Sequence, residues 1–180
     1  TSCGSEKMCK KIAIFFSLTG LKGTNIDEDA LTRWSNTFTR LNAKFPKYEI
    51  VLKFHPSFSS ALRTAMKAFI HKRCPYMQFI EDQTSAAELI LQSKIVIGDA
   101  SSTLIWANYL STKVVVSFNQ TNMINSGDMN RYEGIYCIED DSKVADIAFE
   151  ALENMNGAYK HANKGNKLSL FDFATSITTN

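Results

Sequence analysis

Two short stretches of the sequence combine residue types that bind anions. The first is KFHP at 53–56, where an apolar run stops at His55. The second is DASST at 99–103, where Ser101 and Ser102 follow another apolar run. An imidazole nitrogen and serine hydroxyls can both donate hydrogen bonds to phosphate oxygens, and a protonated imidazole also adds charge. These residue types indicate phosphate binding if the chain brings the two stretches together.

Each stretch also has a simpler interpretation. His55 could be a loop histidine beside a turn proline, because Pro56 ends a strand by removing a backbone donor. Ser101 could be only the N-cap of a helix, with Ser102 as filler. Neither stretch is specific by itself, so the choice between phosphate binding and a structural role depends on the strands and helices around them.

The chain alternates short apolar runs with longer helical patterns. The runs are rich in β-branched and aromatic residues, which predicts six strands, at 11–16, 48–54, 76–80, 94–98, 113–118 and 134–138. Apolar residues at helical spacing predict five helices, at 27–45, 59–73, 85–93, 101–110 and 141–155. The last helix has Asp141 or Ser142 as its expected N-cap.

Strands that alternate with helices join through right-handed crossovers into a mostly parallel sheet with both faces covered. We therefore predict an α/β fold, a Rossmann-like three-layer α/β/α domain with a six-stranded sheet. The domain is expected to span 11–158, after a tail or linker at 1–10 and before a loop and short helix at 159–180. No internal repeat or low-complexity segment is visible.

Ligands of such sheets lie beyond the carboxyl ends of the strands, where the next helices begin. His55 is expected at the end of the second strand, and Ser101 and Ser102 at the start of the helix after the fourth. A helix N-terminus offers unpaired N–H groups and a partial positive charge. The helix at 101–110 is apolar on all sides, so we expect it to be buried.

Composition narrows the class of protein. The chain has 180 residues, 44% of them hydrophobic, which is enough for one packed core. No window approaches the roughly 20 apolar residues of a membrane span. The four cysteines show no C-x-x-C spacing, which favours a reducing cytoplasm over a zinc site or a disulfide framework.

Charge is unevenly distributed along the chain. Residues 1–73 carry 13 basic and 5 acidic side chains, whereas residues 74–180 carry 7 and 13. The basic half contains KFHP, so a positive field there would favour an anionic ligand, although such a charge run is more often a solvated surface. Nucleic acid is not an expected partner, because the basic half has no arginine-rich or aromatic-interleaved patch.

Several more specific catalytic and nucleotide-binding motifs are absent from the sequence. The serines lack the second glycine of G-x-S-x-G, which argues against a serine hydrolase. FFSLTGLKGT, after the first strand, does not contain G-x-G-x-x-G, and no Walker pattern occurs anywhere. A dinucleotide oxidoreductase and a P-loop kinase or ATPase are therefore not expected.

KFHP and DASST, in this order and at strand ends, resemble the His-Pro and Ser-Ser motifs of a group of glycosyltransferases. The group comprises the GT-B-fold bacterial sialyltransferases and polysialyltransferases and the related CDP-glycerol glycerophosphotransferases of teichoic-acid and capsule synthesis. The resemblance covers roughly residues 10–155 and corresponds to the carboxyl-terminal, nucleotide-binding half of such an enzyme. It implies a CMP-sugar or CDP-glycerol donor, with no cofactor and no required metal.

The resemblance also implies roles for individual residues. His55 would contact the donor phosphate as the catalytic residue, and Ser101 and Ser102 would hold the same phosphate. The implied nucleotide- and phosphate-binding set is Lys53, His55, Pro56, Ser101, Ser102 and Thr103.

Further candidate contacts lie outside the two motifs. Glu81 and Asp82, after the third strand, could bind the ribose or base, or could merely begin the next helix. Lys22, after the first strand, is a candidate loop contact. The acidic run at 139–141 is expected to be a loop and an N-cap, with a metal site as the weaker interpretation.

The acceptor is expected to be an oligosaccharide or glycerol phosphate, bound by a second, amino-terminal domain that 180 residues cannot also hold. We therefore expect a fragment, or a chain that works with a partner, in the cytoplasm or at the inner face of the membrane through peripheral attachment. Two other interpretations remain open: a domain of a UDP-sugar-dependent GT-B enzyme, either an epimerase or a hexosyltransferase, and a non-catalytic Rossmann-like interaction module.

Overall fold

The computed structural model describes residues 10–16, 21–22, 25–80, 83–99, 101–110, 114–118, 129 and 132–158. Their main sheet has six strands: β1 (Lys11–Phe16), β4 (Glu49–Phe54), β5 (Gln78–Phe79), β6 (Ile95–Gly98), β7 (Val114–Phe118) and β8 (Ile135–Ile138). Within the described residues, five α-helices accompany it: α1 (Glu28–Lys44), α2 (Ser60–Arg73), α3 (Ala86–Leu91), α4 (Ser102–Tyr109) and α6 (Val144–Ala158). The predicted type and order of these eleven elements are confirmed.

The strand order is β5-β4-β1-β6-β7-β8, and every neighbouring pair is parallel. Numbered along the chain, the six strands therefore run 3-2-1-4-5-6, which is the order of a Rossmann sheet. The central strand β1 pairs with β4 on one side and β6 on the other. This is the point where successive connections change direction, and it is where such sheets bind ligands.

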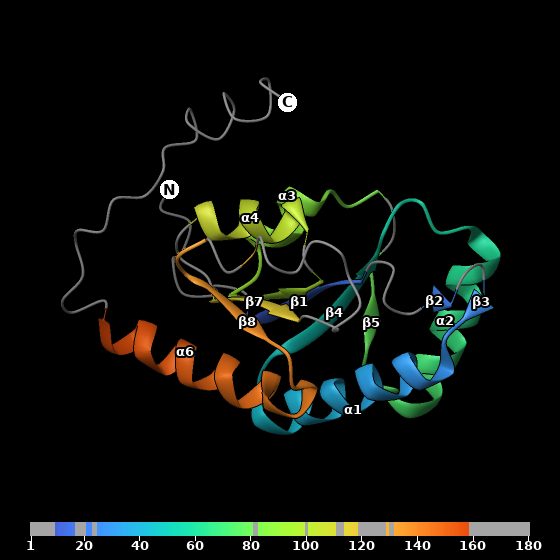
Figure 1. Ribbon diagram of the computed structural model, residues 1–180, viewed down its shortest axis with the longest axis horizontal. Coiled ribbons are helices and arrows are strands. Elements are labelled where there is room, and N and C mark those ends of the chain that lie inside the picture. The colour runs from blue at the N-terminus through green and yellow to red at the C-terminus, as the bar shows by residue number, and fades with distance from the viewer. Residues whose placement is uncertain are drawn as a thin grey trace, which may run out of the picture.

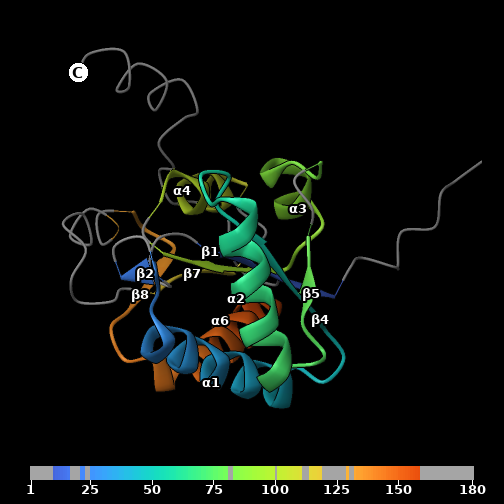
Figure 2. The ribbon, with the colours of Figure 1, turned by 90° about the vertical axis from the view of Figure 1, so that its right-hand side faces the viewer.

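Helices cover both faces of the sheet. Figures 1 and 2 show α1 and α6 on one side and α3 and α4 on the other. The period of two in β1 explains the division, because Ile12, Ile14 and Phe16 pack in the cluster with α1, α2 and α6. The intervening Ala13 and Phe15 pack in the cluster with α3 and α4. The predicted three-layer α/β/α architecture is confirmed.

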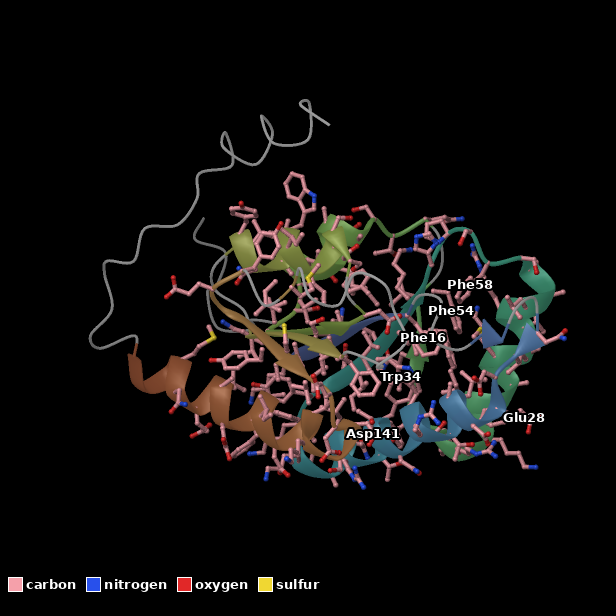
Figure 3. All side chains as sticks on the ribbon, in the orientation of Figure 1. Phe16, Glu28, Trp34, Phe54, Phe58 and Asp141 are labelled. Carbon is pink, nitrogen blue, oxygen red and sulfur yellow. The ribbon has the colours of Figure 1, made fainter. Side chains whose placement is uncertain are left out.

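An aromatic cluster forms the centre of the first of these two layers. The indole of Trp34, in α1, is fully buried, and its ring centroid lies 5.1 Å from that of Phe16, 5.5 Å from Phe38 and 4.7 Å from Phe118. Figure 3 shows Phe16 beside Trp34, with Phe54 and Phe58 further along the same row. The rings connect α1, three strands and the segment after β4 into one packed unit.

Two details differ from the sequence-based expectation. The helix α4 is not buried on all sides: Leu104 and Ala107 are buried, but Trp106 is 49% exposed. The N-cap before α6 is neither Asp141 nor Ser142. Asp140 precedes a 3₁₀ turn at Asp141–Lys143, and its carboxylate accepts a hydrogen bond from the backbone of Ser142 at 3.0 Å.

Asp140 also has the lowered pKa that is expected of a capping carboxylate. Hydrogen bonds from the side chain and backbone of Ser142 hold the pKa of Asp140 below its ordinary value. The acidic run is therefore a loop and a cap, as expected. Among the residues that the structure describes, no three His, Cys, Asp or Glu side chains gather as metal ligands would.

A small two-stranded antiparallel sheet, β2 (Leu21–Lys22) with β3 (Asn25–Ile26), precedes α1 and was not predicted. Two-residue strands are too short to leave an alternating pattern in the sequence. Within the described ranges, no helix has both the length and the apolar character to cross a membrane.

Candidate functional site

A cavity of about 560 Å³ opens at the carboxyl end of the sheet. Phe15 and Phe16 line it from β1, and residues after β4 and β6 line it on either side. The cavity therefore lies at the change of direction in the strand order. Its lining includes all six residues of the predicted nucleotide- and phosphate-binding set: Lys53, His55, Pro56, Ser101, Ser102 and Thr103.

Strand β4 places Lys53 and His55 on the same side of the sheet. Lys53 pairs with Phe15 of β1 in the ladder, and His55 follows two residues later, so the two side chains share a face. The backbone N–H of His55 donates to the carbonyl of Phe16 at 2.9 Å, one step beyond the end of the strand. This backbone hydrogen bond fixes the position of His55 beside the end of the central strand β1.

Pro56 then turns the chain. The backbone N–H of Phe58 donates to the carbonyl of His55 at 3.1 Å, which closes a turn with proline at its second position, where proline is favoured. The side chain of Phe58 is buried against Phe54, and Nη2 of Arg63 donates to the carbonyl of Pro56 at 2.8 Å. These contacts define the path of the His-Pro turn at the cavity.

The imidazole itself has a defined partner. Its Nδ1 lies 2.7 Å from the hydroxyl oxygen of Ser57 and accepts a hydrogen bond from the backbone N–H of Ser57 at 3.2 Å. His55 lines the cavity, whereas Ser57 does not. Ser57 therefore contacts the imidazole from outside the cavity, on the solvent-exposed side of the turn.

The second motif contributes a helix N-terminus. Ser101 takes the N-cap position of α4 with extended backbone, but its hydroxyl makes no capping hydrogen bond. The serines that begin α2 and α3 behave differently: Ser59 accepts from the N–H of Leu62 and Ser85 from that of Glu88. Ser101 is therefore not a hydrogen-bonded N-cap, which argues against the simplest structural explanation for its presence. Its hydroxyl and the first N–H groups of α4 are donors at the cavity.

Positive charge dominates the lining. Lys53 is only 8% exposed, and Arg63 of α2 also lines the cavity, while none of its described lining residues is acidic. An anion in the cavity would lie against a lysine largely removed from water, where electrostatic attraction is stronger than at the surface. The arrangement is suited to a phosphate group.

The sequence analysis missed seven lining residues: Phe15, Phe16, Phe54, Arg63, Thr84, Ser85 and Ala86. Arg63 lies one turn into α2, and only the folded turn shows that its guanidinium reaches the carbonyl of Pro56. Other expected contacts lie outside the described residues, namely Glu81, Asp82 and the side chain of Lys22.

Gly98 is required where β6 passes β1 below the cavity. A Cβ at this position would lie 2.8 Å from the backbone carbonyl oxygen of Phe15, which is closer than real Cβ contacts. We expect Gly98→Ala to destabilise the chain by about 1–3 kcal/mol, because the strands must separate to accept the methyl group. Urea unfolding would measure the change.

Ser117→Ala is the matched control, since Ser117 pairs with Gly98 in the ladder and already carries a Cβ. The Ser117 hydroxyl is buried with no hydrogen-bond partner among the described residues, so Ser117→Ala should leave the unfolding midpoint unchanged or raise it, and should not lower it. A Gly98→Ala midpoint equal to that of the unaltered chain would show that the contact at Phe15 relaxes without cost.

Comparison with known proteins gives the class of the fold. No family model matches the sequence, and no curated protein does either. Among solved structures, the chain is similar to UDP-GlcNAc 2-epimerase from Neisseria meningitidis bound to UDP-GlcNAc, with a TM-score of 0.61 and 15% identity over 93% of this chain. The chain therefore has the Rossmann-like fold of one half of a GT-B protein.

A second solved structure, the wall teichoic acid polymerase TagF, aligns with 82% of this chain at 17% identity and a TM-score of 0.37. The chain covers 42% of the epimerase and 36% of TagF. It thus spans less than half the length of either structure. At this identity the epimerase comparison establishes the fold alone, and the site must be argued from the residues of this chain.

Proposed function

We propose that this chain is the donor-binding domain of a glycosyltransferase that uses a CMP-sugar, such as a sialic-acid-like donor, or CDP-glycerol in surface polysaccharide synthesis. The observation that carries the proposal is that the His-Pro turn and the Ser-Ser helix start, separated in sequence, line one basic cavity with Lys53 and Arg63. Neither stretch was specific alone. Their meeting at the ligand-binding edge of a GT-B-type domain supports the resemblance on which the proposal rests.

The chemistry of transfer fits this lining. When the glycosyl or glycerophosphate group leaves, negative charge grows on the departing nucleotide phosphate. Donors fixed at that phosphate stabilise the transition state more than the ground state, because they meet more charge there. His55, the hydroxyls of Ser101 and Ser102 and the N-terminus of α4 would supply these donors. Lys53 and Arg63 would balance the phosphate charge, so the proposed step requires no metal.

Transfer also requires a group that removes the proton of the acceptor hydroxyl. None of the described lining residues is a carboxylate. We assign the base, and the site for an oligosaccharide or glycerol-phosphate acceptor, to another domain or partner chain. In this proposal the present chain binds and activates the donor in the cytoplasm or at the inner face of the membrane, and the other domain supplies the acceptor.

Calorimetric titration with CMP, CDP and UDP tests the proposal. We expect CMP or CDP to bind at least about tenfold more tightly than UDP, a difference of about 1.4 kcal/mol. Tighter binding of UDP would instead support the UDP-sugar alternative, either an epimerase or a hexosyltransferase. If the folded chain binds none of the three, the non-catalytic interaction module becomes the better interpretation. Circular dichroism of the same sample would show that it is folded.

A further inference from the structure

Ser57 directs two hydrogen-bonding groups at a single atom. Its hydroxyl oxygen lies 2.7 Å from Nδ1 of His55, and its backbone N–H donates to the same nitrogen at 3.2 Å. The turn that creates this geometry is fixed independently, by the Phe58 to His55 backbone bond and by Arg63 at the carbonyl of Pro56. Nδ1 is therefore held against Ser57 by contacts that do not depend on the serine hydroxyl.

The backbone N–H and the hydroxyl of Ser57 together determine where the imidazole proton lies. An N–H group can only donate, so Nδ1 must present its lone pair to Ser57. A neutral imidazole carries one N–H, and with Nδ1 as acceptor that proton is on Nε2. The hydroxyl can then donate to Nδ1 as well. Both interactions favour the same tautomer.

We infer that Ser57 is a positioning residue that holds neutral His55 in the Nε2–H tautomer and makes this N–H the donor to the bound phosphate. The inference rests on the proposed function only for the identity of the phosphate. Donation to Nδ1 withdraws electron density from the ring, and linked hydrogen bonds polarise one another, so the Nε2 proton becomes a stronger donor. Ser57 acts in this way without contacting the ligand.

The tautomer can be measured without any ligand. Long-range ¹H–¹⁵N correlation spectra of the ¹⁵N-labelled chain at pH 8.5, where imidazoles are neutral, distinguish Nε2–H from Nδ1–H rings. Comparison with His55→Gln identifies the signals of His55 among the three histidines. We expect His55 to be essentially all Nε2–H. Ser57→Ala loses the 2.7 Å hydroxyl contact but keeps the 3.2 Å backbone N–H contact, so we expect it to shift part of the population toward Nδ1–H. Ser57→Thr, which keeps the hydroxyl, should restore the Nε2–H form.

Nucleotide binding provides the second measurement. Loss of the serine donor should weaken binding of the preferred nucleotide by about three- to tenfold, the effect of one ordinary hydrogen bond. Ser57→Thr should bind almost as tightly as the unaltered chain. Ser60→Ala is the control, because Ser60 is also exposed and begins α2. Ser57 is exposed, so neither Ser57→Ala nor Ser57→Thr should change the unfolding midpoint.

The outcomes separate the two claims. An Nδ1–H ring in the unaltered chain, or Ser57→Ala spectra and affinities equal to those of the unaltered chain, would overturn the role of Ser57. An Nε2–H ring that depends on Ser57 in a chain that binds no nucleotide would support the tautomer assignment and contradict the proposed function. Nucleotide binding with an Nδ1–H ring would contradict this inference alone.

Discussion

Replacing His55 with alanine should weaken binding of the preferred cytidine nucleotide by about 10- to 100-fold. A hydrogen bond to a charged group contributes about 1.5–3 kcal/mol, and 1.4 kcal/mol corresponds to a factor of ten. The Ser101→Ala/Ser102→Ala double variant should lose a similar amount, because it removes two hydroxyl donors while leaving the α4 backbone in place. Titration calorimetry on each purified variant would measure the change.

His71→Ala is the matched control for the histidine. His71 is exposed in the last turn of α2, at the opposite end of that helix from Arg63 and the cavity. It should bind the nucleotide as tightly as the unaltered chain. Should His71→Ala and His55→Ala weaken binding equally, the effect would come from the overall positive charge, and the phosphate site would have to be placed elsewhere.

Trp34→Ala should have the largest effect on stability, a loss of about 3–5 kcal/mol. The indole is fully buried and contacts rings of β1, α1 and β7, so removing it leaves a cavity between the sheet and the helix layer. Neighbouring rings cannot fill this space without leaving their own contacts. Urea unfolding followed by circular dichroism would give the change in free energy.

Trp106→Ala is a natural comparison because the chain has only two tryptophans and this one is 49% exposed. It should alter stability by less than about 1 kcal/mol, since a surface substitution removes little buried area. Equal destabilisation by the two changes would mean that the aromatic cluster around Trp34 repacks, or that Trp106 is covered in solution. The fluorescence of each variant would report the environment of the tryptophan that remains.

Much of this fold could be predicted from the sequence because local patterns and tertiary structure agree. Each of the six sheet strands is a short apolar run, and helical spacing separates them, so the crossover rules leave few topologies. The cap of the 3₁₀ turn that leads into α6 was missed because Asp140, Asp141 and Ser142 are all good capping residues in succession. Only the backbone geometry, with a 3₁₀ turn before the helix, distinguishes Asp140 from its neighbours.

The exposure of Trp106 was missed for a different reason. An all-apolar helix carries no polar face from which its orientation can be read, so composition alone suggested complete burial. In the structure α4 packs on one side of the sheet, through Leu104 and Ala107, and the opposite side of the helix remains exposed.

The candidate site was predictable to the extent that it depends on strand ends. Parallel strands bring their carboxyl ends to one edge, so His55 and Ser101 could be expected together from their positions after the second and fourth strands. Arg63 and Ser57 were not predictable in this way. Their roles depend on the exact path of the His-Pro turn, which directs one to a carbonyl and the other to an imidazole nitrogen.

The central position of β1 has a consequence for biosynthesis. Ile12 pairs with Ile50 on one side and with Ile95 on the other, so the second partner is made long after the first. Until Gly98 has emerged from the ribosome, one edge of an almost wholly apolar strand has no partner, and such edges promote aggregation. Chains truncated before β6 should therefore need chaperones to remain in solution, whereas chains that extend past β7 can close the sheet around β1.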